Sequence, residues 1–179
     1  SVWVIDPIDG TNNFVAQKED FAVMVAYFEE GQGQFGLIYD VMRDQLFYGG
    51  GEFPVYRNEL ELIPFVDRPL DTLLMSSNVG MLEKNEWGMV DLGMKCLGIR
   101  VYGSAGISFS KILSGGILAY FSYLWPWDYA AAAIMGERLG YTVLNLNGDQ
   151  PNYQTLEPIM MVPKAKLSEI QTYLKKGRN

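Results

Sequence analysis

Hydrophobic and polar residues alternate in short runs through the first third of the chain. Each run has the length of a strand and is rich in Val, Ile, Leu, Phe or Tyr, and polar or glycine-containing turns separate the runs. The runs cover residues 2–5, 21–28, 35–41, 46–48, 53–56 and 60–63. Strands joined by short turns pair with their sequence neighbours, so this part predicts an antiparallel meander.

The rest of the chain alternates strand-like and helical patterns. Strand patterns cover residues 72–76, 99–102, 117–121, 141–146 and 158–162, and helical patterns cover residues 81–90, 105–113, 130–139 and 165–175. Four consecutive alanines at 130–133 allow the third helix to pack closely against a neighbour. Strands that first meander and later alternate with helices predict an α+β protein with mixed and antiparallel sheets.

Two aspartates follow the first apolar run directly, in the sequence Ile5-Asp6-Pro7-Ile8-Asp9. Pro7 cannot donate a ladder hydrogen bond, so the run at 2–5 is expected to be a buried strand that ends before it. A tight bend there can turn both carboxylates toward one point, where they need a cation between them or a shared proton. Oxygen ligands with no Cys or His nearby suit Mg²⁺.

Gly10 and Thr11 add the features of a phosphate site to this bend. Glycine lets the backbone approach a ligand closely, and amides that open a helical turn favour an anion. The alternative is purely structural, because Asp, Pro and Gly are also the commonest turn residues. The local sequence leaves both interpretations open.

Composition narrows the classes of function. A chain of 179 residues, with 49% hydrophobic and 20% charged residues, fits one globular domain. The net charge of −7 argues against broad binding to nucleic acids or anionic membranes, so neither partner is expected. Zero histidines exclude a histidine-dependent triad and any His-ligated metal, and the single Cys96 excludes an intrachain disulfide. No apolar run approaches a membrane span, and we expect a cytoplasmic protein.

Two motifs carry a resemblance to a known family. The stretch WVIDPIDGTNNF at residues 3–14 resembles the first signature of the inositol monophosphatase family, the lithium-sensitive, magnesium-dependent phosphatases. Trp127-Asp128, followed by Tyr129 and the alanines, resembles the family's Trp-Asp pair at the start of a small-residue helix. The resemblance runs from Ser1 to about Lys176. It implies a layered αβαβα fold in one domain over residues 1–179, a partial domain that begins at the first metal-binding motif.

The resemblance also implies the metal ligands and the catalytic residues. Asp6, Asp9, the Ile8 carbonyl and Asp128 would hold Mg²⁺, for which Mn²⁺ or Ca²⁺ can substitute. Asp6 and Thr11 would be catalytic, with the Thr11 hydroxyl orienting the attacking water. Without this match, Asp128 would be interpreted as an ordinary helix cap.

The substrate contacts implied by the resemblance lie on two segments and one carboxylate. The Gly10 and Thr11 amides would hold the phosphate. Gly103, Ser104, Ala105 and Asp128 would contact the rest of the substrate, although Ser104 alone reads equally as a helix cap. Inositol-preferring members carry a Glu shortly before the Trp-Asp pair, whereas residues 119–126 contain no acid. The family implies inositol monophosphate or a related sugar or nucleotide phosphate as the substrate, and the missing acid argues against specificity for inositol monophosphate alone.

The resulting hypothesis is a phosphoric monoester hydrolase that acts as a homodimer and uses Mg²⁺ and a metal-activated water. One alternative is a non-catalytic module that retains the phosphatase fold. An aspartyl-phosphate mechanism is excluded because the Asp-x-Asp spacing would place its nucleophile at Pro7. Family members carry a Gly-Glu-Glu motif before the first signature, and this chain has none. A polypeptide starting at Ser1 is therefore expected to be nearly inactive and prone to aggregate, and a longer one active.

Overall fold

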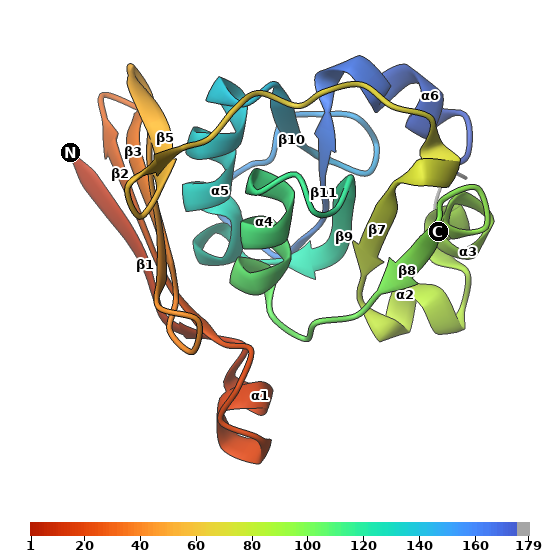
Figure 1. Cartoon of the computed structure of the whole chain (residues 1–179), viewed down its shortest axis with the longest axis horizontal. Coiled ribbons are helices and arrows are strands. Elements are labelled where there is room, and N and C mark those ends of the chain that lie inside the picture. The colour runs from red at the N-terminus through yellow and green to blue at the C-terminus, as the bar shows by residue number, and fades with distance from the viewer. Residues whose placement is uncertain (175–179) are drawn as a thin grey trace.

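Two β-sheets lie on either side of a helical layer in the computed structural model, which describes residues 1–174 (Figure 1). The first sheet has six strands in chain order, and each adjacent pair is antiparallel. Its strands are β1 (Val2–Asp9), β2 (Ala22–Glu29), β3 (Gln32–Asp40), β4 (Gln45–Gly50), β5 (Phe53–Arg57) and β6 (Leu60–Glu61). The predicted antiparallel meander is confirmed.

The second sheet is mixed and has the strand order β10-β11-β9-β7-β8. Its strands are β7 (Leu74–Ser77), β8 (Gly98–Arg100), β9 (Ala119–Leu124), β10 (Tyr141–Asn145) and β11 (Glu157–Pro163). Strand β7 runs parallel to β8 and β9, whereas β11 is antiparallel to both of its neighbours. The later strands thus form the second sheet that the alternation with helices predicted.

The helices complete the layers of the fold. Helices α4 (Ala105–Leu113) and α5 (Pro126–Arg138) lie between the sheets, while α2 (Val79–Glu83), α3 (Met89–Gly93) and α6 (Leu167–Gln171) cover the far side of the second sheet (Figure 1). The short helix α1 (Thr11–Ala16) follows β1. This sheet–helix–sheet–helix order confirms the layered α+β class. None of the helices in residues 1–174 has the length and hydropathy of a membrane span.

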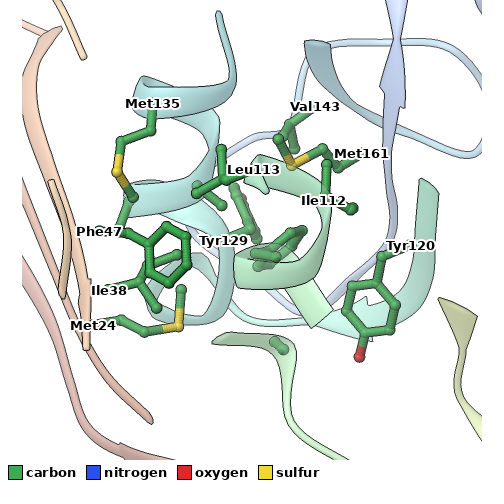
Figure 2. Close-up of a cluster of buried hydrophobic side chains, with 14 of the residues drawn as sticks. Met24, Ile38, Phe47, Ile112, Leu113, Tyr120, Tyr129, Met135, Val143 and Met161 are labelled. Atoms are coloured by element: carbon green, nitrogen blue, oxygen red, sulfur yellow. The ribbon is translucent and has the colours of Figure 1, made fainter. Parts of the chain in front are cut away.

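The main core fills the space between the first sheet and the central helices. Met24, Ile38 and Phe47 from the sheet point toward α5, where Tyr129 and Met135 are fully buried (Figure 2). The helix approaches very closely, because a Cβ atom on Gly36 of β3 would clash with the carbonyl oxygen of Ala131. The prediction that the alanine run allows close packing is therefore confirmed.

Strand β1 differs from its prediction in two ways. It does not end before Pro7 but continues to Asp9, with a register shift between Asp6 and Asp9. Proline is tolerated there because β1 is an edge strand and the irregularity removes the need for its missing N–H. The run at 2–5 is also largely exposed rather than buried, and Trp3 is 60% exposed. The reason is that no helix within residues 1–174 covers the outer face of this sheet (Figure 1).

Two predicted helices are shorter than expected. The pattern at 81–90 is split into α2, a 3₁₀ turn (Glu86–Gly88) and α3, because Asn85 and Trp87 adopt left-handed backbone angles. The Asn85 side chain accepts a hydrogen bond from the Val90 amide at 2.8 Å and so caps the second piece. The closing pattern at 165–175 forms a 3₁₀ turn (Lys164–Lys166) and α6, and its last residue lies outside the described residues. Another 3₁₀ turn (Leu70–Thr72) precedes β7.

Candidate metal centre

Three carboxylates from separate parts of the chain meet at the end of β1. Asp6 and Asp9 lie in the last part of that strand, and Asp128 lies in the first turn of α5. Each offers one oxygen, and these oxygens all lie within 4.8 Å of one another. Asp9 is buried, with 6% exposure, while Asp6 and Asp128 are half-buried. Three acidic oxygens at this spacing form a donor set suited to a hard divalent cation.

Asp9 is fixed by the beginning of α4. Its carboxylate accepts hydrogen bonds from the Ser104 hydroxyl, from the Ala105 amide at 3.1 Å and from the Gly106 amide at 2.8 Å. A negative charge is favourable at this position because the first amides of a helix lack partners within it. Ser104 also caps the helix by accepting from the Ile107 amide at 3.1 Å. The start of α4 therefore sets the orientation of the carboxylate.

The other two carboxylates are oriented by backbone amides. The Ile8 amide donates to Asp6 Oδ1 at 3.1 Å, and the Trp125 amide donates to Asp128 Oδ2 at 2.7 Å. Burial raises the pKa of Asp128 to about 7, and the charges of Asp9 and Asp6 push it in the same direction. Burial also raises the pKa of Asp6 and of Asp9, although the hydrogen bonds they accept oppose this. The shared cause is charge crowded away from water, which a bound cation would relieve.

Thr11 and Gly10 link the metal centre to α4. The Thr11 hydroxyl donates to the Ile8 carbonyl at 3.1 Å, so it lies next to a candidate ligand. Gly10 has a φ of +82°, and a Cβ atom on it would lie 2.8 Å from the Ser104 Cβ atom. Only glycine accommodates both this conformation and this approach. The structure thus brings Gly10, Thr11 and the segment Gly103–Ala105 to the carboxylate cluster.

Asn13 is a residue near the site that the sequence patterns did not reveal. Its side-chain amide donates to the Asp20 carbonyl at 2.9 Å and to the Tyr102 carbonyl at 2.7 Å. These bonds tie α1 to the loop that follows it and to the segment just before α4. A pair of adjacent asparagines is visible in the sequence, but only the fold shows that Asn13, rather than the exposed Asn12, points inward.

Arg43 secures the far end of the same loop. Its Nη2 atom lies 2.8 Å from Asp20 Oδ1, and its Nη1 atom lies 3.1 Å from Oδ2 of the fully buried Asp40. The Asp20 residue is therefore held through both its carbonyl, by Asn13, and its carboxylate, by Arg43. This network keeps α1 and the segment around Thr11 in one position relative to α4.

We expect an Asn13→Ala substitution to lower the free energy of unfolding by about 2 kcal/mol, because two backbone carbonyls lose their donor. Asn12→Ala is the matched control, because the neighbouring side chain is exposed. Urea unfolding of the two variants and the wild type measures the difference. Equal effects of the two substitutions would show that Asn13 does not hold these segments together.

The layered sheets and the carboxylate cluster together define a protein of the layered sugar-phosphatase fold. A family model described as "Inositol monophosphatase family" matches residues 1–176. This chain belongs to the inositol monophosphatase family.

Individual relatives agree with this family. The "Inositol-1-monophosphatase" of Bacillus subtilis (strain 168) is 36% identical over 153 residues, which cover 83% of this chain and 58% of that protein. The chain therefore spans less than two thirds of that relative's length. The crystal structure of inositol monophosphatase-II from Staphylococcus aureus MSSA476 is similar, with a TM-score of 0.89, 31% identity, and coverage of 97% of this chain and 68% of that one. An IMPase/NADP phosphatase complexed with Mg²⁺ and phosphate has a TM-score of 0.87, 26% identity, and coverage of 98% and 67%.

Proposed function

We propose that this chain carries the main part of the active site of a Mg²⁺-dependent phosphatase that hydrolyses a small phosphate monoester with water. The observation that carries the proposal is the convergence of Asp6, Asp9 and Asp128 within 4.8 Å. The family membership supports it, as does the similarity to an IMPase/NADP phosphatase crystallised with Mg²⁺ and phosphate.

The proposed metal ligands are Asp6, Asp9, Asp128 and the Ile8 carbonyl. All of them are oxygen donors, as Mg²⁺ prefers, and Mn²⁺ or Ca²⁺ can use the same set. Divalent cations held there would neutralise charge on the phosphoryl oxygens and make a water more acidic. The donor set fits this role because its carboxylates are crowded and partly withdrawn from water.

Thr11 is proposed to position the attacking water together with Asp6. Since the Thr11 hydroxyl donates to the Ile8 carbonyl, the lone pairs of its oxygen are directed elsewhere and can accept a hydrogen bond from water. The Gly10 and Thr11 amides are proposed to hold the phosphate. In support, the first helical hydrogen bond of α1 runs from the Phe14 amide to the Gly10 carbonyl, at 3.0 Å. The amides that precede Phe14 therefore have no partner within the helix.

The segment Gly103–Ala105 and Asp128 are proposed to contact the rest of the substrate. Ser104 and Ala105 both bond to the Asp9 carboxylate, so a substrate group beside that carboxylate also meets this segment. Residues 119–126 contain no acid that could accept hydrogen bonds from a polyol. We therefore propose a substrate range that is not restricted to inositol phosphates.

A phosphate-release assay on the intact protein that contains this chain tests the proposal. Inositol 1-phosphate, fructose 1,6-bisphosphate and phosphoadenosine phosphate form the substrate panel, each with Mg²⁺ or with a chelator. We expect release from at least one substrate with Mg²⁺ and none with the chelator. Inactivity toward every monoester in the presence of Mg²⁺ would contradict the proposal.

A further inference from the structure

Thr11 lies between two residues that bond to the segment at the start of α4. On one side of it, Asp9 accepts hydrogen bonds from two amides of that helix, the closer one at 2.8 Å. On the other side, the side-chain amide of Asn13 donates to the carbonyl of Tyr102, just before the helix, at 2.7 Å. The chain is therefore attached to the start of α4 both before and after Thr11.

Helix α1 depends on Asn13 for its position relative to α4. The helix projects from the end of the first sheet (Figure 1), and each of its six residues is at least partly exposed. Gly10, which precedes it, has a φ of +82°, a region that glycine enters freely. Phe14 packs edge-on against Phe21, just before β2, with ring centroids 5.0 Å apart, but this contact does not reach α4. The bonds from Asn13 thus restrict a pivoting motion about Gly10 that would carry Thr11 with it.

The side chain of Asn13 is engaged by the protein itself rather than left open to a ligand. Its nitrogen donates both of its hydrogens to carbonyl oxygens, those of Tyr102 and, at 2.9 Å, of Asp20. The nitrogen must face these carbonyls, because the opposite orientation of the amide would place oxygen against oxygen. The Asn13 oxygen lies against Gly103, where a Cβ atom would be only 2.8 Å from it. Asn13 is thus placed to position its neighbours and not to contact a substrate.

Gly103 provides the room that the Asn13 side chain needs. Its φ is +71°, and a Cβ atom on it would also lie 3.1 Å from the Asn13 nitrogen. A side chain at this position would therefore push the Asn13 amide away from its two carbonyls. Gly115 has nearly the same φ, +72°, but a Cβ atom on it would meet no described atom within 4 Å apart from its chain neighbours. Gly115 is consequently a matched control for the backbone conformation of Gly103.

We propose that Asn13 is a positioning residue for the hydrolysis: it fixes the Thr11 hydroxyl relative to the carboxylate cluster, and Gly103 makes room for it. This inference rests on the proposed function, in which Thr11 orients the attacking water. The Thr11 hydroxyl donates to the Ile8 carbonyl at 3.1 Å, so the direction of its lone pairs follows the position of its backbone. A displacement of about 1 Å in such a group can lower the rate about a hundredfold.

Steady-state kinetics on the intact protein, with a monoester that it hydrolyses and a range of Mg²⁺ concentrations, test the inference. We expect Asn13→Ala to lower kcat about a hundredfold, whereas KM and the Mg²⁺ concentration for half-maximal activity stay within about twofold. The cation should still bind because backbone amides and the Ser104 hydroxyl, not Asn13, orient the cluster carboxylates. The assay is run well below the unfolding midpoint, where a mere loss of stability leaves kcat unchanged. Asn12→Ala, at the exposed neighbour, should match the wild type.

A double-mutant cycle with Thr11→Val shows whether Asn13 acts through Thr11. Once the hydroxyl is absent its position no longer matters, so adding Asn13→Ala should lower kcat by less than about threefold. Gly103→Ala should lower kcat about tenfold on its own, because it displaces the Asn13 amide, and Gly115→Ala should not. In the Asn13→Ala background there is no amide to displace, so Gly103→Ala should add little.

Two results would overturn the inference while the proposed function stood. One is wild-type kcat in Asn13→Ala, and the other is a loss that is just as large in the Thr11→Val background. If Asn13→Ala does not fold, Gly103→Ala replaces it in both backgrounds, with Gly115→Ala as its control, and the same two results decide. An inactive wild type would contradict the proposed function itself, and the inference with it.

Discussion

Replacing Asp6 with Asn is expected to lower kcat/KM for a phosphate monoester by about a thousandfold in the intact protein. The substitution removes one negative oxygen from a cluster whose three carboxylates meet within 4.8 Å. Asparagine keeps an oxygen that can accept from the Ile8 amide, which donates to Asp6 Oδ1 at 3.1 Å. The local fold should therefore survive, and the loss should come from weaker binding of the cation and a misplaced water.

The matched control for this prediction is Asp71→Asn. Asp71 is an exposed aspartate in the 3₁₀ turn before β7 and takes no part in the cluster. The Asp71→Asn substitution changes the net charge by the same amount as Asp6→Asn, so the comparison separates a local effect on the cluster from a general electrostatic effect. Phosphate release measured over a range of substrate concentrations gives kcat/KM for both variants. Similar activity of the Asp6 variant and the wild type would remove Asp6 from the proposed machinery.

The second large effect is expected from Gly36→Ala, which should lower the free energy of unfolding by about 2–3 kcal/mol. A Cβ atom there would clash with the Ala131 carbonyl oxygen and lie 3.1 Å from the carbonyl carbon. Both atoms belong to the backbone of α5, so no side-chain rotation can relieve the overlap. The helix would have to move away from β3, where much of the main core lies. The midpoint of thermal unfolding should fall by about 5–10 °C for a chain of this size.

Gly80→Ala adds the same methyl group where there is room for it. Gly80 is exposed in α2, and a Cβ atom would lie 3.6 Å from the Asn78 Oδ1 atom, an ordinary contact. Alanine is also the better helix former, so stability should stay the same or rise slightly. Differential scanning calorimetry compares the two variants. If Gly36→Ala were as stable as Gly80→Ala, α5 would not pack on the first sheet as closely as described.

The sequence predicted best where local chemistry and tertiary structure agree. Asp128 and Ser104 were both candidate helix caps in the sequence; Asp128 lies in the first turn of α5, and Ser104 is the N-cap of α4. The alanine run correctly indicated a close helix–sheet contact, because small side chains on α5 bring its backbone against Gly36. Asp6 and Asp9 were predicted as a pair from the bend after the first apolar run, whereas only the family resemblance added Asp128 to them.

The features that the sequence did not predict depend on distant contacts. Pro7 stays within β1 because that strand is at the edge of its sheet, and position in a sheet is not a local property. The helix expected at 81–90 breaks at Asn85 and Trp87, where capping of Val90 outweighs the apolar spacing. Asp9 is held by amides 96 and 97 residues further along the chain. The same applies to Asn13, whose partner Tyr102 is 89 residues away.

The metal centre is the basis of the whole functional account, and thermal unfolding with and without Mg²⁺ tests it most directly. At a Mg²⁺ concentration about 100 times the dissociation constant, binding should stabilise the intact protein by about 2.7 kcal/mol. The unfolding midpoint should then rise by about 5–10 °C. Asp6→Asn and Asp128→Asn should each lose most of this rise, and Asp71→Asn should keep it. A wild type that Mg²⁺ leaves unchanged, or an equal rise in all three variants, would contradict a cation site at Asp6, Asp9 and Asp128.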